Sequence, residues 1–387
     1  LVGALPGYSG LRVRYPLNQK GRPDDLIVFQ GASYFRALGR HQAYGLSTRG
    51  LAIGMDSASE SFPRFTSYWL KKPEESADSV TLYALLEGRE VTGAYRFVVT
   101  PGGTTRVEVK ARLFFRERAA EAGFAPLTSM FHFGENTLQK PNDWRPEVHD
   151  SDGLLIAADG GWVWRPLDNP VGVSTTRFKV TELKGFGLLQ RDRSFSSYED
   201  LEADYERRPS AWVVPEGSWG PGEVVLYTFQ TRDETVDNMN AFWRPHQVPE
   251  VGKPYDLEYV IEWRMAEPNN ATLTVLETRV GQRTLDHSAT TFVIEFSAPE
   301  DFEAMEIEAY RAALDTGPNL QCDEPVLEYN EHEKAIRVFF HVKNPEASSQ
   351  IQVFPLRLTL QREGKDISEV WNYDWTIPPQ PVAAKAN

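Results

Sequence analysis

Cysteine is almost absent from the chain. Only one of its 387 residues, Cys322, carries a thiol, and one thiol can form neither an internal disulfide nor a metal site made of cysteines. A run of about 18 apolar residues is lacking too, so we predict no membrane-spanning helix. A single thiol is compatible with the cytosol, and equally with a periplasm in which no disulfide is needed.

Positive charge is in short supply as well. The chain has 41 Lys and Arg against 55 Asp and Glu, a formal net charge of -14 at pH 7, and it has no dense run of basic residues. Proteins that bind nucleic acids contact the phosphates through basic patches, so we predict no nucleic-acid partner. Charged residues make up 25% and hydrophobic residues 41%, the usual composition of a folded globular protein.

An initiator methionine and a signal peptide are both missing. The first residues, Leu1-Val2-Gly3-Ala4-Leu5, begin as though inside a longer protein, so we expect an N-terminal portion to be missing or removed. Export therefore cannot be read from the residues given. The length is enough for one large domain with a smaller one, or for two to three average ones.

The dominant hydrophobic period is two, the period of β-strands. Residues 105–114 alternate apolar and charged side chains, as expected of a half-buried antiparallel strand, and Gly102-Gly103 before them favour a hairpin turn. The 10 Trp, 15 Tyr and 21 Phe suit cross-strand packing, with a few available to stack on sugar rings. Segment 302–314 fits a helix or a strand equally well. Further strand candidates are 26–30, 79–86, 154–158, 161–165, 223–231, 256–264 and 271–280.

A polar break at 281–290 divides the chain. Beyond it about four strands lie within about 100 residues, the size of one small sandwich. These strands are Thr291–Phe296, Lys334–Lys343, Ile351–Gln361 and Val370–Ile377. We therefore predict an all-β fold with a large β-sandwich at 1–285 and a small one at 286–387.

Residues 144–153 combine several reactive side-chain types in a short stretch. They contain Trp144, Arg145, His149 and three carboxylates, and they end on Gly153. Taken alone, a solvated turn is the commoner explanation, because turns use such residues. A sugar-binding cleft would use the same types, since it needs a flat aromatic face, a bidentate donor and a placed acid.

A second acidic cluster lies at 233–243. Asp233 or Thr235 could cap a helix there, with acids favoured in its first turn. The functional alternative is a pair, Glu234 and Asp237, which a helical turn would place on one face. Near a third carboxylate this pair would bind protons more tightly, and one member could act as an acid near neutrality.

The charged segment 191–212 lies between the two clusters. It can be a surface loop whose ion pairs each contribute little. The alternative is a binding segment in which Tyr205, Arg208 and Trp212 contact the hydroxyls and ring faces of a sugar.

Other chemistries lack their motifs. Residues 150–153 resemble a calcium loop without its third acid, its placed glycine or its closing glutamate. No H-E-x-x-H, G-x-S-x-G or G-x-x-x-x-G-K-[ST] occurs, so we predict no metal and no cofactor. Carboxylates among aromatics are the best-supported chemistry, and glycoside hydrolysis is its usual outcome.

Several separated segments resemble one family, the osmoregulated periplasmic glucan biosynthesis proteins OpgG/OpgD (MdoG/MdoD). The resemblance runs from about residue 5 to the end of the larger domain and continues more weakly beyond it. The segments that carry it are Gly31-Ala32-Ser33-Tyr34-Phe35-Arg36, 44–53, 126–131, Arg145-Pro146-Glu147-Val148-His149-Asp150, 184–191 and Asp233-Glu234-Thr235.

The resemblance implies a fold, a place and a function. The fold is a large sandwich of the galactose-mutarotase type followed by an immunoglobulin-like sandwich, and the place is the periplasm of a Gram-negative bacterium. Members are implicated in making β-1,2-linked glucans, and some are endo-β-1,2-glucanases that invert the anomeric centre. The expected partners are β-1,2-glucan and the inner-membrane glucan synthase machinery. The resemblance leaves the oligomeric state open, with a homodimer among the options.

The resemblance also implies roles for single residues. Asp237 matches the general acid, Asp150 matches the base that activates water, and Glu234 matches a neighbouring acid important for activity. Tyr205 and Arg208 look like subsite contacts. We add His149, Trp144 and Trp212 as predicted substrate contacts.

The chain departs from the family pattern at Asp152, where the family has asparagine. This extra charge would raise the pKa of Asp150 if it pointed inward. A non-catalytic glucan-binding or scaffolding protein is therefore kept as the alternative function. A mutarotase-like or lyase-like enzyme is less favoured, because no histidine pair is evident.

Overall fold

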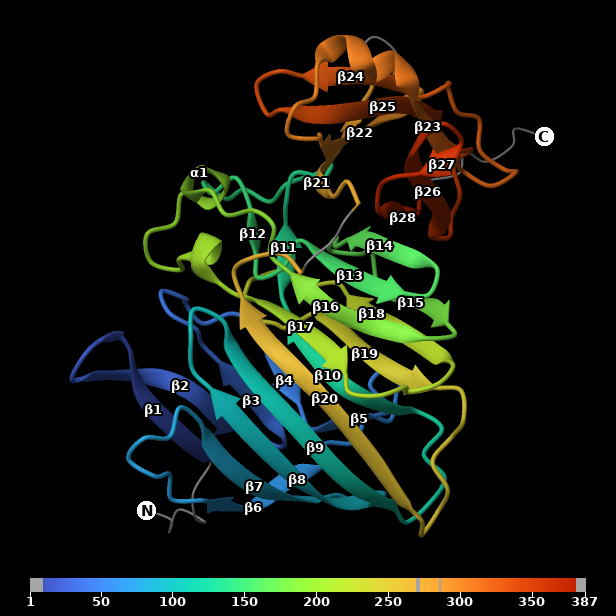
Figure 1. Cartoon of the computed structure of the whole chain (residues 1–387). Helices are drawn as coiled ribbons and strands as arrows, with labels where there is room; N and C mark the ends of the chain where they lie inside the picture. Colours follow the sequence, from blue (N-terminus) through green and yellow to red (C-terminus); the bar gives the residue numbers. More distant parts are fainter. Residues whose placement is uncertain (1–9, 269–271, 285–286, 381–387) are drawn as a thin grey trace.

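Strands make up almost all of the regular structure in the computed structural model, which describes residues 10–268, 272–284 and 287–380 (Figure 1). The described helices are α1 (Phe195–Tyr198) and the 3-10 turns η1 (Tyr205–Arg207) and η2 (Ala304–Ala309). The predicted all-β sandwich fold is confirmed. No helix among these residues is long and apolar enough to cross a membrane.

One layer of the molecule is a nine-stranded sheet. Successive side chains of its strands point to opposite faces because the residue period of a strand is two, and the central strand β10 is buried on both faces. In order they are β1 (Gly10–Gln19), β2 (Arg22–Gln30), β3 (Tyr34–Ala37), β4 (Ser47–Arg49), β10 (Ala122–Ser129), β19 (Met239–Pro245), β18 (Gly222–Phe229) and β15 (Val173–Val180), with β5 (Leu51–Ile53) paired to β10.

The second layer is a thirteen-stranded sheet. In order its strands are β23 (Tyr310–Asp315), β26 (Gln352–Arg362), β28 (Val370–Ile377), β14 (Gly161–Pro166), β13 (Gly153–Ala158), β16 (Leu183–Leu189), β17 (Ser210–Pro215), β20 (Pro254–Arg264), β9 (Thr105–Phe115), β8 (Val91–Thr100), β7 (Val80–Glu87) and β6 (Arg64–Leu70), with β27 (Lys365–Asp366) on β26. The predicted strand at 105–114 and the hairpin turn before it are confirmed, since β8 and β9 pair antiparallel.

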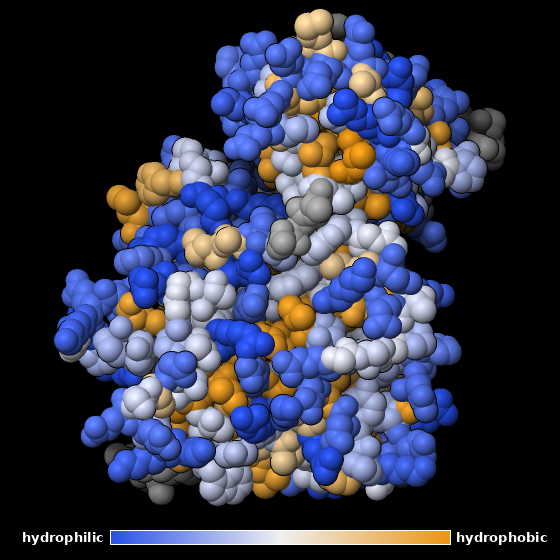
Figure 2. Space-filling view, in the orientation of Figure 1, coloured by the Kyte–Doolittle hydropathy of each residue, from blue (hydrophilic) through white to orange (hydrophobic). Residues whose placement is uncertain are grey.

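The main core lies between these two sheets. Apolar side chains from both contribute to it, among them Phe29 and Trp243 from the first sheet and Phe97 and Trp263 from the second. In the space-filling view, hydrophobic residues also gather in the lower middle of the visible face, over the region of β20 and β9, with hydrophilic ones among them (Figure 2).

A four-stranded sheet covers the end of the thirteen-stranded sheet that is formed by the C-terminal strands of the chain. Its order is β21 (Val275–Gln282), β22 (Ala289–Ser297), β25 (Ala335–Lys343) and β24 (Val326–Asn330). It packs on β23, β26 and β28 through a second apolar core. Strand β28 pairs in parallel with β14 at Trp164 and Trp371, so the C-terminal strands extend the large sheet.

The predicted division of the chain at 285/286 lies outside the described residues, and the division into two domains stays a prediction. By hydrogen bonding, β21 belongs with the C-terminal sheet, although it precedes that boundary. The ambiguous segment 302–314 contains both structures, with η2 followed by β23.

Candidate active site

The short strands β11 (Phe131–Phe133) and β12 (Val148–His149) bring the two acidic clusters together. The buried amide of Asn238 accepts a hydrogen bond from the N–H of Phe131 at 2.9 Å and donates to the carbonyls of Phe131 at 3.0 Å and Phe229 at 3.0 Å. At the end of β12 the N–H of Asp150 donates to the carbonyl of Met130 at 2.8 Å. These bonds fix Asp150 and Asp237, the residue before Asn238, at one site.

The carboxyls of Asp150 and Asp237 interact electrostatically. Burial raises the pKa of Asp150, its ion pair with Arg208 opposes that rise, and the charge of Asp237 adds to it. Only 7% of the Asp150 side chain is exposed. The site therefore holds one carboxyl almost entirely inside the protein.

Asp237 has different surroundings. It is solvent-exposed, yet the protein around it displaces enough water to raise its pKa, while the charges of Arg36 and Arg49 act in the opposite direction. No ion pair within 4.0 Å involves Asp237 in the part of the chain that the structure describes. It is therefore open to solvent and less strongly paired than Asp150.

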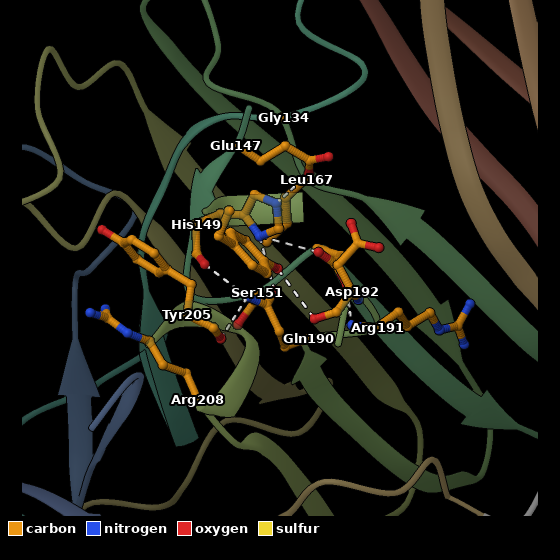
Figure 3. A network of polar contacts seen from close by, with 12 residues as sticks. Gly134, Glu147, His149, Ser151, Leu167, Gln190, Arg191, Asp192, Tyr205 and Arg208 are labelled. Carbon is orange, nitrogen blue, oxygen red and sulfur yellow. Dashed lines mark hydrogen bonds and ion pairs between the residues drawn. The ribbon is translucent and has the colours of Figure 1, made fainter. Parts of the chain in front are cut away.

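Arg208 forms an ion pair with Asp150, and the close-up shows Tyr205 and Arg208 next to each other beside the network around His149 (Figure 3). The Arg208 guanidinium covers the ring of Tyr205 at 4.0 Å and donates to the carbonyl of Ala203 at 3.0 and 3.1 Å. The ring of Tyr205 is buried, so its faces are not open to a sugar. Both predicted subsite residues thus lie near Asp150, and Arg208 is in contact with its carboxylate.

Glu234 is held by two donors. Its Oε2 accepts from the Tyr205 hydroxyl at 2.7 Å and from Nη1 of Arg145 at 2.6 Å, and Arg145 also pairs with Asp143 and Asp200. These contacts join Glu234 to a polar frame at the edge of the site.

The predicted helical turn at 233–237 is wrong. The segment is an irregular turn in which Oδ1 of Asp233 accepts from the N–H of Thr235 at 2.9 Å. A short aspartate side chain can bond its own backbone in this way, and this favours a turn over a helix.

The surroundings of Asp237 include residues that the sequence patterns did not single out. The guanidinium of Arg49 lies 4.5 Å from the ring centroid of Tyr34 and 5.1 Å from that of Phe62, and it pairs with Glu60 at 2.5 Å. Tyr34 and Arg49 belong to the segments that carried the resemblance. No spacing in the sequence indicates that they face Asp237, because that contact is long-range.

The two predicted tryptophan contacts separate in the structure. Trp144 is 69% exposed, and the guanidinium of Arg145 lies 5.9 Å from its ring centroid, beside the polar frame. Trp212 lies on β17, where its neighbours Ala211 and Val213 face the main core. Successive side chains of a strand point to opposite faces, so Trp212 lies on the outer face, away from the acids.

His149 is inside the protein and not on a ligand surface. Its Nε2 lies 2.9 Å from Oε2 of Glu147, its Nδ1 lies 2.9 Å from Oε1 of Gln190, and Gln190 donates to its carbonyl at 2.8 Å (Figure 3). Burial alone would lower the pKa of His149, but Asp152 and Glu147 raise it to about 10. His149 therefore anchors the end of β12, directly before Asp150.

Asp152 accepts hydrogen bonds from the N–H groups of Arg191 and Asp192 and lies 3.1 Å from Nδ1 of His149. The charge that distinguishes this chain from the family pattern acts on His149.

Four side chains behind the site offer ligand atoms to a cation. Glu135, Glu147, His149 and Asp192 place one such atom each within 4.8 Å of one another. Two ligands on opposite sides of a divalent ion are about 4.2–4.8 Å apart, so the group has the size to hold one. It can also hold protons, because burial raises the pKa of Glu135 to about 8 and that of Asp192 to about 9. The irregular spacing of these residues explains why no sequence motif revealed them.

Comparisons with known proteins identify the family of the chain. The family model described as "Periplasmic glucan biosynthesis protein, MdoG" matches residues 2–375. A "Glucans biosynthesis protein G" from Pseudomonas paraeruginosa is 42% identical over 381 residues, covering 95% of this chain and 72% of its own length. A relative of the same name from Ralstonia nicotianae is 42% identical over 386 residues, covering 96% and 75%.

A solved structure, the N-terminal periplasmic domain of ScsB from Proteus mirabilis, aligns with a TM-score of 0.18 and 8% identity over 74% of this chain and 94% of that one, too little to support any argument. The match to the family model over nearly the whole chain, together with 42% identity to these relatives, shows that the chain belongs to the MdoG family of periplasmic glucan biosynthesis proteins.

Proposed function

We propose that the chain acts in periplasmic glucan biosynthesis as an endo-β-1,2-glucanase that inverts the anomeric centre. The observation that carries this proposal is a pair of interacting carboxyls with unlike surroundings, Asp150 and Asp237. Two titratable groups whose environments differ in this way suit opposite roles in acid and base catalysis.

The surroundings of the two carboxyls support the roles that we propose for them. The pKa of both carboxyls is raised, but the close ion pair with Arg208 favours the ionised form of Asp150, which suits a base. Asp237 is open to solvent and has a raised pKa, so it retains a proton closer to neutrality, which suits an acid.

In the reaction, Asp237 gives its proton, through a substrate hydroxyl, to the glycosidic oxygen as the bond from that oxygen to the anomeric carbon breaks. A water attacks the same carbon from the opposite face, and its proton passes to Asp150. Solvent then returns the proton to Asp237 and removes it from Asp150, so one water is consumed for each bond cleaved.

Access to Asp150 limits how the water is activated. With 7% of its side chain exposed, Asp150 has little surface for direct contact with a sugar. Proton transfer through ordered water fits this burial, and it allows the carboxyls to stand further apart than the roughly 6.5–9.5 Å of a direct inverting pair. Glu234, held by Tyr205 and Arg145, then positions the acid loop and does not transfer protons itself.

The test is cleavage of linear β-1,2-glucan. We expect the chain to shorten the polymer and Asp237→Asn to reduce turnover by about 10²–10⁴-fold. Asp78→Asn, at an exposed carboxylate outside the site, is the matched control and should retain full activity. An unchanged polymer at high protein concentration would contradict the proposal.

The second candidate is a non-catalytic glucan-binding or scaffolding protein that works beside the inner-membrane synthase machinery. The near-complete burial of Asp150 in its ion pair with Arg208 favours it, because such a pair can be purely structural. This candidate predicts no turnover by the parent chain and glucan binding that survives Asp237→Asn.

A further inference from the structure

Trp212, which lies away from the acids, lines a separate cavity of about 390 Å³. Its lining residues come mainly from β13, β14, β16, β17 and β20, which are neighbouring strands of the large sheet (Figure 1). None of the acid-site residues described above lines it. The cavity is therefore distinct from the site of Asp150 and Asp237.

Small residues make room for flat rings on this face. A Cβ on Gly185 would lie 2.4 Å from Cζ2 of Trp212, so the indole lies directly on the backbone of β16. The ring of Trp162 lies nearly parallel to it, at 21° and with ring centroids 5.9 Å apart, and Ala157 also lines the cavity. Trp212 itself is buried, with 5% of it exposed, so the partly exposed Trp162 carries the accessible aromatic surface of the cavity.

The rim is polar and balanced in charge. Lys184 and Asp159 are exposed, and Arg264 donates to Glu262 at 2.7 Å with both side chains partly exposed. Two cations and two carboxylates give no net charge, so the rim selects neither a phosphate nor a metal ion. Aromatic faces bordered by paired donors and acceptors suit a neutral ligand with apolar C–H faces and many hydroxyls, which is a saccharide.

We propose that this cavity, lined by Trp162, Trp212, Lys184, Glu262 and Arg264, is an accessory saccharide site that holds a second stretch of a glucan chain. The choice of glucan as ligand rests on the proposed function, whereas the saccharide class rests on the lining. A polymer that is bound at one site and reaches the other has a raised effective concentration there, so it binds more tightly, whereas a short oligomer gains nothing. The accessory site would therefore favour long chains.

The experiment compares affinities for linear β-1,2-glucan polymer and for an oligomer of about five glucose units, by isothermal titration calorimetry. All measurements use an Asp237→Asn background, so that turnover does not interfere. Losing one stacking ring should weaken polymer binding about tenfold. We therefore expect Trp162→Ala to lower the ratio of polymer affinity to oligomer affinity, and Lys184→Ala to lower it less.

Controls separate this effect from unfolding and from failure of the proposed function. Trp69→Ala removes an exposed indole from β6, at the far edge of the same sheet, and should leave the ratio unchanged. Lys184 is exposed, so its replacement tests the cavity even if Trp162→Ala unfolds. If the chain with Asp237 intact shows no turnover but Trp162→Ala still lowers the ratio of polymer affinity to oligomer affinity, the hydrolase proposal fails and the accessory site stands. The accessory site would be overturned if the ratio of polymer to oligomer affinity were the same in the Asp237→Asn chain with and without Trp162→Ala or Lys184→Ala. It would also be overturned if the polymer did not bind at all.

Discussion

Arg208 makes the two acids of the site unequal. It is ion-paired with the almost buried Asp150, whereas Asp237 is influenced by Arg36 and Arg49 without a close ion pair. A carboxylate that loses the cation ion-paired with it while staying buried must bind its proton more tightly.

The first prediction concerns this cation. Arg208→Gln removes the main group that opposes burial and the charge of Asp237 and leaves the smaller effect of His149, so the pKa of Asp150 should rise further. The acidic limb of the kcat/KM profile should then move to higher pH, and activity below neutrality should fall more than activity above it. A profile whose acidic limb stays where it is in the parent would argue against Asp150 as the base.

Some residue roles were predictable from the sequence and others were not. The two acids and Arg208 were found by resemblance, and the structure brings them together. The burial of His149 depends on partners such as Gln190, far along the chain, which no local pattern reveals. The outward direction of Trp212 follows from alternation with the small Ala211 and Val213 along β17, and is readable once the strand and its buried face are known.

At the scale of elements, the site depends on how β11 and β12 are attached to the sandwich. Asn238 makes three hydrogen bonds to the backbones of Phe131 and Phe229 while wholly buried. Removing its amide would leave buried backbone groups without partners, which costs about 1–3 kcal/mol.

The second prediction follows from that attachment. Asn238→Ala should lower the free energy of unfolding by about 1–3 kcal/mol and reduce turnover, because the spacing of Asp150 and Asp237 is relaxed. Denaturant unfolding and glucan cleavage measure the two effects. The exposed Asn142 is the control, and Asn142→Ala should stay within about 0.5 kcal/mol. Equal stability of both variants would refute the attachment.

The third prediction concerns the cluster behind β12. Folding raises the pKa of Glu135 from 4.5 to about 8, and that of His149 from 6.5 to about 10. The folded state therefore binds more protons than the unfolded state across this range. Stability should fall as pH rises from about 4.5 to about 10, by at most about 1.4 kcal/mol per pH unit for each proton.

Unfolding measured with a chelator present tests this sign. Glu135→Gln should flatten the decline, since an amide resembles the protonated acid, and it should be more stable than the parent at pH 9. Glu74→Gln, at an exposed acid, should leave the slope as it is. A parent whose stability rises with pH over this range would contradict the assignment.

The strands were more predictable than the turns between them. Period two identified β9 and β28 because each buries one face of a sheet. The turn at 233–237 was misread as a helix start, since an acid-rich segment serves both structures and the bond from Thr235 to Asp233 decides between them. The parallel pairing of β14 with β28 joins residues about 200 positions apart, and no local pattern encodes such a contact.

At the scale of the whole molecule, the net charge of -14 bears on the choice of glucan. A glucan with acidic substituents would be repelled by this charge, and salt would screen that repulsion. The fourth prediction is that unsubstituted β-1,2-glucan binds more tightly than a substituted one at low salt, and that added salt reduces the difference. Binding assays at two ionic strengths check this, and tighter binding of the substituted glucan at low salt would contradict it.

The most direct test of the account is the anomeric form of the first product released from linear β-1,2-glucan, followed by proton NMR before mutarotation. Inversion predicts that the α-anomer appears first with the parent chain, and that Asp237→Asn and Asp150→Asn release far less of either anomer. Initial release of the β-anomer, or undiminished cleavage by either variant, would contradict the claim that these two carboxyls work together by inversion.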